Sequence, residues 1–149
     1  MDKTLILSCC QSKLQGTHKA IDLYQGKAFK LIRKENLLDT VDVWILSAEL
    51  GLIHSSEPIS WYELKMNETR SIELIDQGIP SRYRDYEGEP SVLPTGEINI
   101  YGGKLYRDVL NSYFDKTIEL IGRNRGIGDH FSALLKFVNE NKPQGVLPI

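Results

Sequence analysis

Short apolar runs alternate with stretches of helical spacing along this chain. The runs at residues 4–7, 41–46 and 117–121 are apolar and partly β-branched, so they predict buried strands. Apolar residues recur at steps of three and four over residues 18–36, 67–77, 104–114 and from 129 to 138, which predicts amphipathic helices. Gly26 interrupts the first of these, so that helix starts either at His18 or only after Gly26.

The middle of the chain is less regular. Residues 55–65 contain Pro58 and are expected to form a loop, and residues 81–86 a short helix. Residues 91–101 are expected to hold a hairpin that turns at Thr95 and Gly96. Asn67 and Asp129 precede helical patterns and are suited to cap them.

The order of these elements predicts the fold class. A strand, a helix and a second strand within about forty residues favour a parallel pair joined by a crossover. A helix, a strand and a final helix close the chain. We therefore expect one α/β domain over residues 1–149, with three layers around a small, mostly parallel sheet.

Composition and charge narrow the function. The formal net charge of the 149 residues is −2, so a strongly basic nucleic-acid clamp is not expected and any such binding needs a local patch. The two cysteines are adjacent, which disfavours a disulfide between them. With no apolar run of transmembrane length, no signal peptide and no zinc-type spacing, we expect a cytoplasmic protein without a membrane partner, a metal or a cofactor.

The end of the first predicted strand carries the strongest candidate site. Ser8, Cys9, Cys10 and Lys13 follow the apolar run directly. In parallel sheets the loops after the strands bind ligands. A thiolate is a strong nucleophile, and a lysine either attacks as an amine or holds a phosphate. The alternative is that the thiols only fill space and that Lys13 is a solvated charge.

The second predicted strand ends in Ser47, Glu49 and Gly51, and Trp61 and Tyr62 follow on a loop. If the two strands are parallel neighbours, these side chains emerge at the same edge as Cys9 and Lys13. A carboxylate there can activate water or stabilise positive charge on a sugar. The aromatic residues either stack on a base or anchor the loop, and Glu49 either works in catalysis or caps the surface.

The last predicted strand is followed by a glycine-rich, basic turn at residues 122–128. Its glycines let backbone N–H groups approach a phosphate, and its two arginines add positive charge. The spacing matches neither a dinucleotide fingerprint nor a P-loop. The alternative is a tight turn with solvated arginines. The residues assigned to phosphate binding are Arg123, Arg125, Gly126 and Gly128.

Four motifs carry a resemblance to a known family: Leu7-Ser8-Cys9-x-x-x-Lys13, Asp22-Leu23-Tyr24-x-Gly26-x-x-Phe29, Trp44-Ile-Leu-Ser47-Ala48-x-x-Gly51-Leu52-Ile53 and Tyr62-x-x-x-Met66. In this order they resemble small bacterial and phage domains similar to the peroxide-stress protein YaaA. They are also similar to the uracil-DNA-glycosylase-like domain of archaeosine synthase.

The resemblance implies a uracil-DNA-glycosylase-like fold with a nucleobase-sized pocket at the strand ends. It matches Cys9 and Lys13 to a cysteine and a nucleophilic lysine of that domain. This chain has Leu14 and Gln15 where the domain has proline and tyrosine, and Phe29 near the place of a histidine. The resemblance is therefore not extended to the nitrile chemistry of archaeosine synthase.

Together these observations favour a nucleobase-acting enzyme, of N-glycosylase or base-modification type, with DNA or a nucleotide as substrate. The residues assigned to catalysis are Lys13, Glu49 and Cys9. Those assigned to substrate binding are Ser8, Cys10, Tyr24, Ser47, Gly51, Trp61 and Tyr62. The rival interpretation is a non-catalytic module that binds a nucleotide, a nucleic acid or a protein, which the near-neutral charge favours.

Overall fold

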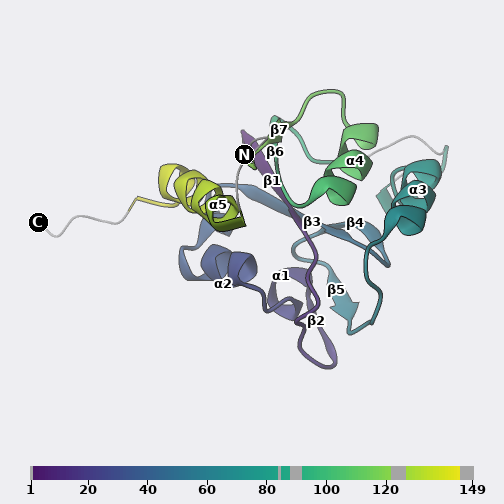
Figure 1. The fold of residues 1–149 in the computed structure, drawn as a ribbon, viewed down its shortest axis with the longest axis horizontal. Coiled ribbons are helices and arrows are strands. Elements are labelled where there is room, and N and C mark those ends of the chain that lie inside the picture. Colours follow the sequence, from purple (N-terminus) through teal and green to yellow (C-terminus); the bar gives the residue numbers. More distant parts are fainter. Residues whose placement is uncertain (1, 84, 88–91, 122–126, 145–149) are drawn as a thin grey trace, which may run out of the picture.

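A five-stranded sheet forms the centre of the computed structural model, which describes residues 2–83, 85–87, 92–121 and 127–144 (Figure 1). The strand order is β4-β3-β1-β6-β7. β1 pairs in parallel with β3 on one side and with β6 on the other, and β6 pairs in parallel with β7. Only β4 runs antiparallel, against β3. The strands are β1 (Lys3–Ser8), β3 (Asp42–Ser47), β4 (Gly51–His54), β6 (Glu97–Tyr101) and β7 (Ile118–Glu119).

Helices cover both faces of this sheet. α3 (Glu68–Gln77) and α4 (Lys104–Tyr113) lie together on one side, whereas α1 (Ala20–Leu23), α2 (Lys27–Lys34) and α5 (Ile127–Asn141) lie on the other (Figure 1). Successive side chains of a strand point to opposite faces. Leu5 and Leu7 of β1 therefore join the core under α1, α2 and α5, while Ile6 joins the core under α3 and α4. The predicted three-layer α/β fold is confirmed.

Residues 18–36 do not form one continuous helix. The chain first makes β2 (Thr17–Lys19), which pairs with β5 (Pro58–Ser60) in a small antiparallel sheet, and then the single turn α1. α2 begins only after Gly26, whose extended ψ of 164° ends any helix arriving from the N-terminal side. Of the two predicted helix starts, the one after Gly26 is confirmed. The expected loop at residues 55–65 contains β5.

The hairpin expected at residues 91–101 is wrong. β6 is an inner strand that pairs in parallel with β1, and Thr95 precedes it as an acceptor for the Thr4 hydroxyl at 2.8 Å. A short strand flanked by turn residues has the same sequence pattern whether it forms half of a hairpin or pairs with a distant parallel strand. β4 was also not predicted. It forms because Gly51, with φ of +76°, returns the chain alongside β3.

The remaining helices agree with the sequence more closely. The Asn67 side chain caps α3 by accepting the Arg70 N–H at 2.8 Å, as predicted. α4 follows its predicted range, and short 3-10 turns occupy Leu37–Asp39 and Ser81–Tyr83. α5 starts at Ile127, before the predicted cap at Asp129. On α5, Phe137 is buried and Leu135 is partly exposed. No helix in the described ranges combines the length and apolarity needed to cross a bilayer.

Gly96 provides a test of the β1–β6 pairing. Its φ of +71° disfavours any residue with a Cβ, and a Cβ there would also overlap the carbonyl oxygen of Asp2. We expect Gly96→Ala to lower the free energy of unfolding by at least about 2 kcal/mol, measured by urea denaturation. Gly103→Ala is the matched control, because a Cβ there meets nothing within 4 Å and only the weaker helix-capping preference of alanine acts, about 1 kcal/mol. Equal losses for the two variants would contradict this account.

Candidate functional site

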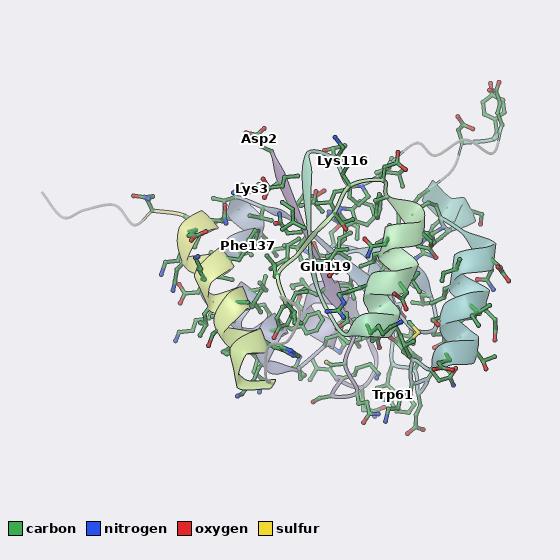
Figure 2. The ribbon with its side chains drawn as sticks, turned by 45° about the horizontal axis from the view of Figure 1, so that its top comes forward. Asp2, Lys3, Trp61, Lys116, Glu119 and Phe137 are labelled. Atoms are coloured by element: carbon green, nitrogen blue, oxygen red, sulfur yellow. The ribbon has the colours of Figure 1, made fainter. Side chains whose placement is uncertain are left out.

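Three parallel strands bring their carboxyl ends to one edge of the sheet. Cys9 follows β1, Ala48 follows β3, and Gly102 follows β6. The Cys9 N–H continues the pairing with β3 by donating to the Leu46 carbonyl at 3.0 Å. A Cβ on Gly102 would lie 3.2 Å from the Ser8 hydroxyl oxygen, so glycine lets the two strand ends approach closely. Figure 2 shows Trp61 near this edge, at the opposite end of the molecule from Asp2 and Lys3 at the start of β1.

The Cys9 sulfur contacts groups from two other elements. The Ala48 N–H donates to Sγ at 3.4 Å, and the Tyr106 hydroxyl of α4 lies 3.3 Å from it. Cys9 itself is half-buried. Hydrogen-bond donors directed at a sulfur stabilise negative charge on it, and the thiolate is the nucleophilic form. This arrangement suits a reactive thiol.

A cavity of about 510 Å³ opens beside Cys9. This volume is within the usual range for small-molecule sites. Leu64, Met66 and Leu105 supply apolar walls, and Lys65 and Lys104 supply positive charge. The full lining is Cys9, Cys10, Gln11, Leu64, Lys65, Met66, Gly103, Lys104, Leu105 and Tyr106.

The start of α4 forms one side of this cavity. Gly103 is the N-cap of α4 and makes no side-chain cap hydrogen bond. The first N–H groups of a helix lack partners inside the helix and carry partial positive charge. Because Gly103 and Lys104 line the cavity, this positive helix end and the Lys104 ammonium act on the same space.

A chain of three buried hydroxyls lies behind Cys9. The Ser47 hydroxyl accepts the N–H groups of Glu49 at 3.2 Å and Leu50 at 3.1 Å and donates to Tyr62 at 2.8 Å. The Tyr62 and Tyr24 hydroxyls lie 2.6 Å apart. Burial raises the pKa of the Tyr24 and Tyr62 hydroxyls well above the usual range for tyrosine, and negative charge on the nearby Cys9 raises it further. Both phenols are therefore neutral.

Two residues expected to bind substrate belong to this interior chain. Tyr24 and Ser47 are both 0% exposed, so a ligand does not reach them in this structure. In this structure they have a structural role, and their substrate-binding role stays a prediction. They hold Tyr62, and with it the loop whose next residues wall the cavity.

Lys13 lies next to the main cavity but does not line it. Its Nζ donates to the carbonyl oxygens of Cys10 and Gln11, each at 3.1 Å, and sits 4.7 Å from the centre of the Tyr62 ring. Lys13 lines a smaller depression of about 160 Å³ together with Trp61 and Tyr62. The two spaces are contiguous, since Gln11, Leu64 and Lys65 line both of them.

Glu49 faces a third depression, of about 370 Å³, whose wall includes Trp61, Tyr62 and Arg82. Cys9, Lys13 and Glu49 therefore line three different depressions, and their action within one pocket stays a prediction. The chain turns after β3 to form β4, and Arg70 fixes this turn by donating to the carbonyl oxygens of Ala48 at 2.5 Å and Glu49 at 2.7 Å. The Glu49 side chain is exposed, and its depression shares Trp61 and Tyr62 with the depression that Lys13 lines.

The other predicted site residues are dispersed. Gly51 lines a different depression, beside Leu74 and Pro80, and its substrate-binding role stays a prediction. Ser8 packs against Gly102. Cys10 does line the main cavity, but its thiol donates to the Ser12 carbonyl at 3.3 Å, and burial raises its pKa.

The predicted phosphate turn falls largely outside the described residues. This applies to Arg123, Arg125 and Gly126. Gly128 belongs to the first turn of α5. The phosphate role of this turn stays a prediction. Within the described ranges, no three His, Cys, Asp or Glu side chains gather as a set of metal ligands.

Several lining residues were missed from the sequence, namely Gln11, Leu64, Lys65, Met66, Gly103, Lys104, Leu105 and Tyr106. A usable signal existed for the last four. Treating residues 97–101 as a parallel strand places the following helix start at the ligand-binding edge. Residues 64–66 gave no such signal, because only tertiary packing brings their loop beside Cys9.

The hydroxyl chain predicts a measurable coupling. We expect Tyr62→Phe to lower the free energy of unfolding by about 1–3 kcal/mol, because it leaves the Ser47 and Tyr24 hydroxyls buried without their partner. Tyr24→Phe should lower the free energy of unfolding less in the Tyr62→Phe background than in the unsubstituted protein. Urea denaturation of the unsubstituted protein, the two single variants and the double variant measures this difference. Tyr86→Phe, at a side chain that is 97% exposed, is the control and should change nothing. Strict additivity would rule out the coupling.

The chain was compared with known proteins. Searches of curated proteins and of solved structures gave no match. Residues 4–136 match the family DUF6884, which is described as a family of unknown function. That span includes Cys9, Tyr106 and every other residue lining the cavity. The chain belongs to the DUF6884 family.

Proposed function

We propose that this protein is a nucleobase-acting enzyme that takes a nucleotide unit, free or within DNA, into the cavity beside Cys9. The observation that carries the proposal is the composition of that cavity. Apolar walls, a thiol with two hydrogen-bonding neighbours, and two lysines surround one space of about 510 Å³. Each of these groups suits a different part of a nucleotide.

The apolar walls suit the base. Leu64 and Met66 approach from the loop before α3, and Leu105 from α4. A flat heterocycle between such side chains loses apolar surface to water on both faces, which favours binding. Enzymes that act on bases in DNA extrude the base into a pocket of this kind.

The lysines suit the phosphate. Lys65 lines the cavity from the loop before α3, and Lys104 lines it from the uncapped start of α4. Lys104 also pairs with Asp108 at 2.8 Å, but this pair is largely exposed and contributes little stability. A phosphate at the helix start would gain from both the ammonium group and the helix dipole.

Cys9 is assigned the role of nucleophile. Lys13, held by two carbonyl oxygens, is assigned to contact the phosphate of an adjoining nucleotide. Glu49 can orient water only for a substrate long enough to reach its separate depression. A non-catalytic binding module is the second candidate. It is favoured because the contacts of Cys9 in the described residues include no imidazole or carboxylate.

Nucleotide binding gives the first test. We expect Lys65→Ala with Lys104→Ala to weaken binding of nucleoside monophosphates at least tenfold, measured by calorimetry, and to leave nucleoside binding unchanged. The physical reason is the loss of two phosphate contacts. Lys30→Ala, at an exposed lysine of α2, is the matched control and should bind as the unsubstituted protein does.

Turnover decides between the two candidates. Incubation with nucleotides and with DNA, followed by mass spectrometry, should show free or altered base, and Cys9→Ser should abolish it while retaining binding. Binding without any product would identify a binding module. Absence of both binding and product would refute the proposal.

A further inference from the structure

We infer that Tyr106 is the acid–base partner of Cys9, and that the site takes a heterocycle with an electrophilic C=N ring carbon, to which the thiol adds. This inference rests on the proposed function. It selects base modification over cleavage of the N-glycosidic bond. The geometric basis is the 3.3 Å contact between the Cys9 sulfur and the Tyr106 hydroxyl, both on the wall of the same cavity.

Tyr106 is distinguished from the other phenols near Cys9. Tyr24 and Tyr62 direct their hydroxyls toward each other and toward Ser47, inside the protein. Tyr106 alone among these three lines the cavity, and its hydroxyl contacts the sulfur directly. A proton on Tyr106 is therefore within reach of both the thiol and a bound ligand.

Packing fixes the position of Tyr106. It lies in the first turn of α4, three residues after the N-cap Gly103. A Cβ on Gly102 would lie 3.0 Å from the Ser8 Cβ and 3.3 Å from the Tyr106 Cβ. The end of β1 and the start of α4 thus meet with no spare space, and the sulfur–hydroxyl distance depends on the body of the fold rather than on a free loop.

The protonation states are consistent with this role. Burial, followed by the negative charge that Cys9 can carry, raises the pKa of Tyr106 above its usual range, so the phenol is protonated at rest and gives up its proton only as it takes that of the Cys9 thiol. The titratable or charged groups near Cys9 include Tyr24, Tyr62 and Cys10, and Lys65 and Lys104 line the same cavity as Cys9. Cys10 is the poorer nucleophile, because burial raises its pKa and its thiol is engaged by Ser12.

The reaction step balances without any further reagent. The sulfur forms a bond to the ring carbon, and the C=N π electrons move to the ring nitrogen. Tyr106 gives its proton to that nitrogen and takes the proton of the Cys9 thiol. The net change is addition of S–H across C=N, with no oxidation or reduction, and its reversal releases the base and restores both side chains.

The test uses two electrophiles on the full chain in a Cys10→Ser background, so that Cys9 is the one remaining thiol. Iodoacetamide alkylates a thiolate without needing a proton donor. 2-(Methylsulfonyl)pyrimidine reacts at an electrophilic ring carbon, and protonation of its ring nitrogen assists attack. Intact-mass kinetics at constant pH give the labelling rate for each.

We expect Tyr106→Phe to slow the pyrimidine reaction at least tenfold and the iodoacetamide reaction by threefold or less. Tyr113→Phe, on the same helix with its hydroxyl bonded to Leu74, is the matched control and should leave both rates unchanged. Tyr106→Phe keeps the aromatic ring and its packing. Equal slowing of the two reagents would reduce Tyr106 to a thiolate stabiliser, and no slowing would remove its role; either result overturns the inference.

A protection assay separates this inference from the proposed function. Nucleoside monophosphates should shield Cys9 from iodoacetamide if they occupy the cavity. Loss of shielding with the tyrosine effect intact would refute nucleotide binding and leave the Cys9–Tyr106 pair established. Shielding without any tyrosine effect would refute the pair and leave the proposed function.

Discussion

Parallel hydrogen bonding on both sides of β1 brings together the strand ends from which the candidate site is built. β1 pairs with β3 from Thr4 to Ser8 and with β6 from Lys3 to Leu7, so the three strands end at one edge. Cys9, Ala48 and Gly102 follow these ends. Their backbones stay close together, because burial of both faces of the sheet fixes the register in which the strands pair. A sulfur, an amide and a helix start then share one space.

The two cores have different relations to that space. The core under α3 and α4 lies directly behind the cavity, because α4 supplies Tyr106 and Leu105 to its wall and the loop before α3 supplies Met66. The core under α1, α2 and α5 contains Tyr24 and Tyr62 and reaches the site through their hydroxyls. One layer therefore shapes the cavity by direct contact, and the other by holding the residues that position its rim.

The sequence predicted the frame better than the site. β1, β3 and the helices at residues 67–77 and 104–114 were recognised because their apolar periodicity is local and strong. β6 was taken for half of a hairpin, because nothing within residues 91–101 distinguishes a local antiparallel partner from the distant parallel one. That error concealed the whole α4 wall of the cavity. The sequence placed Cys9 directly after β1, where it lines the cavity, but it gave no sign that Glu49 lines a different depression, since the short β4 and the Arg70 contacts to this turn depend on tertiary structure.

The loop that contains Tyr62 is anchored at one residue and lines the cavity with others, and the hydroxyl chain of Ser47, Tyr62 and Tyr24 provides the anchor. Tyr62 is anchored to the interior, whereas Leu64 and Lys65, two and three residues later, are exposed on the cavity wall. Side chains at these two positions can vary without disturbing the anchor. Substitutions at positions 64 and 65 would therefore reshape the cavity wall and leave the phenolic anchor in place.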